Sequence, residues 1–295
     1  MGELVVKDVN IKFIVMILFS WVFFIGAILL GIFNHIYLPI EQDILNVFSN
    51  GYITDGQKYF HWLFIIGYFG PLLTYVWYYK QSQKKSFLKL FEIKKIKEYF
   101  QKKKSIELFT FKGVKSSVYF IALIIPFVIF GLIFLADRIS GSNLYVQQYN
   151  LIYVFVLFLF MMLTFSTSEF FFRKYCLEKI KKEKEETKAI YMVSVMSILW
   201  VLPFIGYFNF IYGYSSLIIS VIAYALFYLS VSTILSIVYL KYKNILLNWL
   251  ISAWAFTAFL YTVTNFYGNS LALLINATAY VLIAIYLLKF NVQKS

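Results

Sequence analysis

Residues 151–173 read LIYVFVLFLFMMLTFSTSEFFFR. The run is predominantly apolar over the roughly 20 residues that a helix needs to cross a bilayer, so it predicts a transmembrane α-helix. Glu169 and Arg173 lie near its end, and they are the ionisable residues that we expect closest to the bilayer core. A charge there costs about 2.5–3.5 kcal/mol on insertion scales, so an embedded pair indicates a functional site. Their spacing, with the acid four residues before the base, favours an ion pair along one helix face.

Similar apolar segments recur along the whole chain. Hydrophobic residues make up 61% of the sequence and charged residues only 14%, a balance typical of integral membrane proteins. Each segment is long enough to span a bilayer. We predict an all-α polytopic membrane protein with eight transmembrane helices, at residues 11–33, 59–79, 117–136, 151–172, 188–207, 215–240, 245–263 and 270–288.

The net charge of +13 is explained by membrane topology and not by a nucleic-acid partner. Apart from Lys58 and Arg138, the cations lie in the two terminal segments or in the connections 80–115, 173–188 and 241–243. These are alternate connections, so all their cations fall on one face of the membrane, which the positive-inside rule makes cytoplasmic. We therefore expect a protein of the cell membrane with both termini in the cytoplasm.

Few residues outside the membrane pair suggest chemistry. The two histidines, His35 and His61, are expected at the outer interface, and the single cysteine, Cys176, is expected to be a buried structural thiol. The chain shows no phosphate-binding loop, zinc-type spacing or serine-nucleophile elbow. The sequence predicts no cofactor and no metal.

Two stretches resemble the CPBP family, the CAAX-protease and bacteriocin-processing enzymes. Residues 168–180, SEFFFRKYCLEKI, are similar to the first motif of that family, Glu-Glu-x-x-x-Arg followed by a short apolar and charged helix. Residues 238–246, VYLKYKNIL, resemble its helix, short basic turn and following helix, which in the family carries His-x-x-x-Asn. The resemblance covers about residues 164–263. It implies two regions, an N-terminal three-helix membrane region at 1–150 with a basic cytoplasmic loop at 80–116, and a CPBP-like membrane core at 151–295.

The resemblance also implies where an active site should lie and shows that it is degenerate. In the family the first Glu activates water, while two histidines and an Asn bind water and stabilise the oxyanion. Aligned residue by residue, the motif retains two of its residues here and has lost the others. Glu169 and Arg173 are retained, the first Glu becomes Ser168, the first His falls at Trp200 or Val201, the second His at Ser252, and the Asn at Phe256.

These losses favour a protein that acts by binding. A serine hydroxyl is no general base at neutral pH, and indole or aliphatic groups cannot activate water. The resemblance then implies a bacterial self-immunity factor against a bacteriocin, or a membrane partner that regulates a cell-envelope enzyme or sensor kinase. An active intramembrane endopeptidase is the alternative, and a small-molecule transporter is a third. The expected partners are the lipid bilayer and a membrane or envelope protein or peptide.

Two interpretations of the polar membrane residues stay open. Glu169 and Arg173 either tie the fourth helix to its neighbours or bind a ligand directly. Six other polar residues either line a residual cavity or make interhelical hydrogen bonds: Ser194, Ser197, Asn248, Ser252, Thr257 and Asn276.

Overall fold

The computed structural model describes residues 2–33, 55–83, 114, 116–140, 151–212, 217–265 and 270–292, and this part of the chain consists of helices and turns. Most of the basic loop 80–116 lies outside these ranges. The elements are α1 (Gly2–Phe33), α3 (Asp55–Gln83), α6 (Ser116–Ser140), α7 (Leu151–Leu163), η3 (Phe165–Ser168), η4 (Phe170–Leu177), α8 (Glu178–Ile180), α9 (Glu186–Tyr212), α10 (Leu217–Tyr242), α11 (Ile245–Asn265) and α12 (Ser270–Val292).

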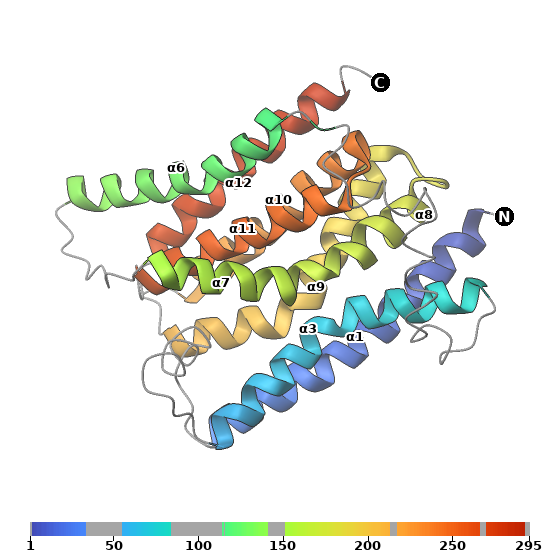
Figure 1. Cartoon of the computed structure of the whole chain (residues 1–295), viewed down its shortest axis with the longest axis horizontal. Coiled ribbons are helices and arrows are strands. Elements are labelled where there is room, and N and C mark those ends of the chain that lie inside the picture. The colour runs from blue at the N-terminus through green and yellow to red at the C-terminus, as the bar shows by residue number, and fades with distance from the viewer. Residues whose placement is uncertain are drawn as a thin grey trace.

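The helices form one bundle in which the short elements η3 and η4 lie at the centre (Figure 1). At one edge α1 and α3 run side by side, and α1 also packs on α9. The helix α10 packs between α9 and α12, while α11 contacts α7 and α6. The two central elements touch α3 and α11, and η4 also touches α9 and α10. Side chains from four long helices therefore converge on one short segment.

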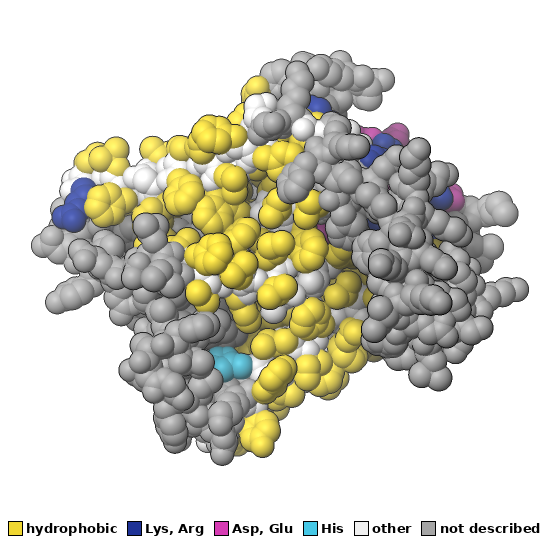
Figure 2. Space-filling view, in the orientation of Figure 1, with side chains coloured by type: hydrophobic (Ala, Val, Ile, Leu, Met, Phe, Trp, Pro, Cys, Tyr) yellow, Lys and Arg dark blue, Asp and Glu magenta, His cyan; other side chains and the backbone are white. Residues whose placement is uncertain are grey.

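The outside of the bundle is apolar, as a membrane requires. Val22 of α1 is 68% exposed and Phe120 of α6 is 65% exposed. Figure 2 shows hydrophobic side chains across the middle of one face, with charged side chains toward its ends. Seven helices of the described ranges are long and apolar enough to cross a membrane. The chain is a multi-pass, all-helical membrane protein, as the sequence predicts.

Each of the eight predicted segments contains helix, and two of them differ from the prediction in ways that matter for the site. The first helix begins at Gly2, so Asp8 and Lys12 belong to the candidate span Val6–Phe33. The fourth segment was predicted as one helix over 151–172, and this is wrong because the α-helix α7 ends at Leu163. The chain then winds as a 3₁₀-helix and as a π-helix before it returns to an α-helix in α8, which ends at Ile180.

The three helices of the N-terminal region, α1, α3 and α6, do not pack together as one group. Helix α6 packs against α11 and α12, on the opposite side from α1 and α3 (Figure 1). The N-terminal end of α1 and the C-terminal end of α12 lie at the same end of the bundle as α8 (Figure 1). That end also holds the turn of residues 181–185, which leads from α8 into α9.

Candidate functional site

The candidate site begins with a break in the fourth membrane segment. Thr164 leaves the helical region of the backbone, with φ −106° and ψ −83°. Its Oγ1 donates to the carbonyl of Phe160 at 2.6 Å, and Thr167 Oγ1 donates to the carbonyl of Thr164 at 2.5 Å. Hydroxyl groups that compete for backbone carbonyls in this way bend helices. The tight 3₁₀ turn of η3 follows the break, and then the wider π-helix of η4, a winding that is frequent at functional sites.

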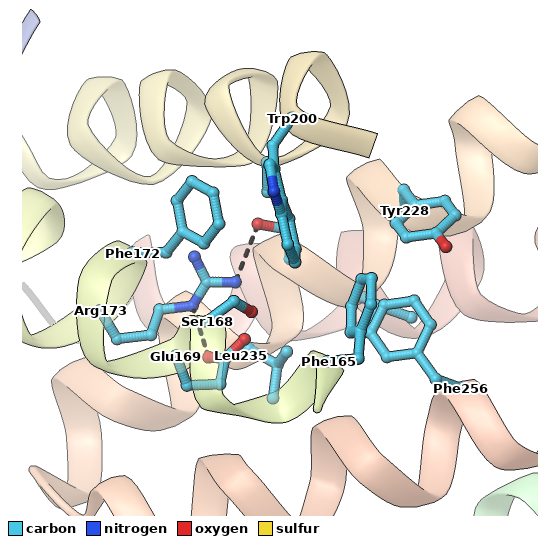
Figure 3. Close-up of a pocket in the computed structure, with 12 residues that line it drawn as sticks. Phe165, Ser168, Glu169, Phe172, Arg173, Trp200, Tyr228, Leu235 and Phe256 are labelled. Carbon is cyan, nitrogen blue, oxygen red and sulfur yellow. Dashed lines mark hydrogen bonds and ion pairs between the residues drawn. The ribbon is translucent and has the colours of Figure 1, made fainter. Parts of the chain in front are cut away.

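This break carries Glu169 and Arg173 into the interior of the bundle. Their residues are 3% and 1% exposed, and Arg173 Nε lies 3.1 Å from Glu169 Oε2. The ion pair that the spacing predicts is therefore confirmed. Figure 3 shows the guanidinium group of Arg173 between the carboxylate of Glu169 and the ring of Phe172.

Two neighbouring helices hold the pair in place. Arg173 Nη2 donates to Ser232 Oγ of α10 at 2.9 Å. From α11, Asn248 Nδ2 donates to the carbonyl of Leu235 at 2.7 Å and lies 3.5 Å from Glu169 Oε2. The pair thus ties η4 to both α10 and α11, which is the structural role considered from the sequence.

A cavity borders the ion pair (Figure 3). It is small, with about 20 Å³ open to the centre of a water molecule. One water needs about 10–15 Å³ of such space, so the cavity has room for one small polar group. Twelve residues line it: Phe165, Ser168, Glu169, Phe172, Arg173, Ser197, Trp200, Tyr228, Val231, Ser232, Leu235 and Phe256.

The structure brings most of the sequence-predicted positions to this cavity. Ser168, Trp200 and Phe256 line it together with Glu169 and Arg173. These positions come from η3, α9 and α11, so residues up to 88 positions apart in the sequence meet at one point. Val201 and Ser252 are buried but are not among the lining residues.

The aromatic side chains form a continuous wall. The rings of Phe165 and Phe256 lie 4.0 Å apart between centroids, and those of Phe165 and Trp200 lie 5.0 Å apart. Trp200 is also fixed from the far side, because its Nε1 donates to Ser20 Oγ of α1 at 3.1 Å. The first helix therefore positions one wall of the cavity.

Several lining residues were not predicted from the sequence. Tyr228 and Ser232 come from the part of α10 that precedes the family-like stretch 238–246. Of the six further polar candidates, Ser197 lines the cavity and Asn248 contacts Glu169. The available signal was the group of hydroxyl residues at 230, 232, 233 and 236, because serine and threonine are enriched where membrane helices pack against one another.

A second polar cluster joins α1 to the end of η4 and to α8. Asp8 Oδ2 accepts from Lys179 Nζ at 2.8 Å and from the hydroxyl of Tyr175 at 3.1 Å, and Lys12 Nζ lies 2.9 Å from Asp8 Oδ1. Both ammonium groups also lie over the ring of Tyr78, at 4.1 and 4.8 Å from its centroid. Both lysines and Asp8 are paired within the cluster, so the cluster holds α1 and α3 against the end of η4.

The lining residues define what the cavity can do. Among the described residues that line it, Glu169 is the only carboxylate and Arg173 the only cation, and aromatic rings occupy much of the remaining wall. Within the described ranges, no group of three or more His, Cys, Asp or Glu could hold a metal ion. Of the other candidates, Cys176 is buried, His61 lies in α3, and His35 lies outside the described residues.

No protein-family model and no curated protein matches the chain.

Proposed function

We propose that this is a non-catalytic membrane protein that acts by binding, with a CPBP-like core over residues 151–295. In this proposal it serves as a bacteriocin self-immunity factor, or as a membrane partner that regulates a cell-envelope enzyme or sensor kinase. The immediate partner is a membrane or envelope protein or peptide.

The proposal rests on the contacts that the carboxylate of Glu169 makes. A carboxylate that activates water must be free to accept a proton in the transition state. Glu169 is instead held 3.1 Å from Arg173 and within 3.5 Å of Asn248. Ser168, Trp200 and Phe256 border the same cavity, and none of the three supplies a base or a metal ligand at neutral pH.

One observation favours the alternative, an active intramembrane endopeptidase. Glu169 borders a cavity with room for one water molecule, so a carboxylate and a water could meet there. The described lining contains no histidine and no second carboxylate that could pass a proton to the leaving group of a cleaved peptide. We therefore prefer the binding function.

The proposed topology has eight membrane spans. Seven of the described helices are long and apolar enough to cross a membrane, and in this proposal α9, which has 27 residues, is the eighth span. An even number of spans places both termini on one side, and the distribution of lysines makes that side the cytoplasm. We propose the cell membrane as its location.

A hydrolysis assay tests the proposal. Purified protein in detergent is incubated with a labelled CAAX-type peptide and with a double-glycine leader peptide, with and without added zinc. We expect no turnover above that of a Glu169→Gln control under any condition. Turnover that the control lacks would restore the endopeptidase and remove the binding function as proposed.

A further inference from the structure

The polar groups around the ion pair are incompletely matched. Arg173 keeps Nη1 buried and without a hydrogen-bond partner, while its Nε and Nη2 face Glu169 and Ser232. On the facing helix α11, Asn248 Oδ1 and Ser252 Oγ are also buried without partners. Asn248 and Ser252 do not line the cavity, whereas Arg173 does. Buried polar groups are nearly always hydrogen-bonded, so the unpartnered Nη1 of Arg173 points to a polar ligand.

The charge balance restricts what this ligand can be. Arg173 and Glu169 are both almost fully buried and neutralise each other at 3.1 Å. A carboxylate or phosphate that entered the cavity would bring a second negative charge next to Glu169 with no further cation to compensate it. A neutral acceptor can take a hydrogen bond from the guanidinium group without that cost.

The size and the walls restrict it further. The space admits about one small polar group, so only the tip of a larger ligand fits. Phe165, Phe172, Trp200 and Phe256 present flat apolar surfaces to that tip. A planar carbonyl group, with a strong acceptor on one atom and no charge, matches both conditions.

We propose that this cavity binds the carbonyl oxygen of an uncharged ester or amide, with Arg173 as hydrogen-bond donor, and that it rejects carboxylates. The inference rests on the proposed binding function and names the ligand chemistry of the same cavity. It reverses the usual preference of arginine for carboxylates, because Glu169 already occupies the place of the anion.

The test uses the two arginines of the chain. Full-length protein labelled with ¹⁵N-arginine in detergent gives guanidinium signals from Arg173 and Arg138 only, and an Arg138→Lys variant assigns them. Arg138 is exposed on α6 and serves as an internal reference. The probes are N-methylacetamide for an amide, methyl acetate for an ester, and sodium acetate for an anion.

We expect a saturable shift of the Arg173 signal with one or both neutral probes, and binding of acetate that is weaker by roughly tenfold or more. Whichever neutral probe binds more tightly identifies the source of the carbonyl. Ser168→Val, which adds bulk inside the cavity, should abolish the shift, and Thr278→Val on the exposed face of α12 should keep it. Should Ser168→Val fail to fold, Ser197→Val fills the same cavity from α9.

Two results would overturn the inference: an Arg173 signal that responds to no probe, or tighter binding of acetate than of both neutral probes. A separate measurement on the same samples tests the proposed function. Proton spectra of the same samples follow the release of methylamine from N-methylacetamide, and release that Glu169→Gln abolishes would refute the non-catalytic function whether or not the Arg173 signal shifts.

Discussion

Ser20 of α1 fills the space directly above Gly70 of α3. A Cβ atom at Gly70 would lie 2.0 Å from Ser20 Oγ, far inside van der Waals contact. Close approach of this kind, made possible by a residue without a side chain, is how membrane helices gain packing energy. The same Ser20 hydroxyl accepts from Trp200, so the contact between α1 and α3 extends to the cavity.

Gly70→Ala should therefore destabilise the protein, although alanine is the better helix former. Overpacking of this kind costs about 1–3 kcal/mol. Thermal unfolding in detergent measures the effect. Gly131→Ala in α6 is the matched control, because nothing lies within 4 Å of a Cβ there, and we expect it to be neutral or slightly stabilising. Restoration of stability by Ser20→Gly in the Gly70→Ala background would identify the clash as the cause, and no restoration would contradict it.

Glu169 and Arg173 should matter for folding. Removal of one partner leaves an uncompensated buried charge, which costs about 3–5 kcal/mol. Glu169→Gln and Arg173→Met should each lower the folded yield in membranes and the unfolding temperature in detergent, whereas the double variant should lose less than the sum. Arg138→Met, at an exposed arginine, is the control. Wild-type yield and stability in both single variants would show that the pair has no structural role.

The substitution Lys243→Gly should stabilise the folded protein. Lys243 has φ 50° in the turn between α10 and α11, and this left-handed conformation costs a residue with a side chain about 1–2 kcal/mol. After the greater entropy of glycine in the unfolded chain is subtracted, we expect Lys243→Gly to gain up to about 1 kcal/mol. Lys241→Gly, in the last turn of α10, should instead destabilise. Equal effects of the two substitutions on the unfolding temperature would contradict this explanation.

Reporter fusions test the orientation. A reporter active only in the cytoplasm should be active after Ser295, and a reporter active only outside should be active near Asp55, at the start of α3. The physical reason is the retention of lysine-rich connections on the cytoplasmic side. A C-terminus found outside would remove the eight-span topology.

The helical membrane fold was predictable because runs of about 20 apolar residues have few other stable states. The break at Thr164 was not predicted. Its signal, the hydroxyl residues at 164 and 166–168, is visible in the sequence, but threonine and serine also occur in unbroken membrane helices. Whether they compete for backbone carbonyls depends on packing that a single segment does not encode.

The site was predictable only where local spacing determined it. Glu169 and Arg173 lie four residues apart, so their pairing needs one segment alone. The placement of Ser232 and Tyr228 depends on which face of α10 turns inward. The hydroxyl residues at 230, 232, 233 and 236 are spread over more than one face of that helix, so its sequence gives no single preferred direction.

The hydrogen bond from Trp200 to Ser20 joins residues 180 positions apart, and this separation sets an order of events during synthesis. Chains emerge from the ribosome with the N-terminus first. Ser20 therefore enters the membrane long before α9 is made, and the hairpin of α1 and α3 must persist until Trp200 arrives. The cavity wall is completed late, so a nascent chain that stalls before α9 has α1 and α3 paired but lacks Trp200 and with it one wall of the cavity.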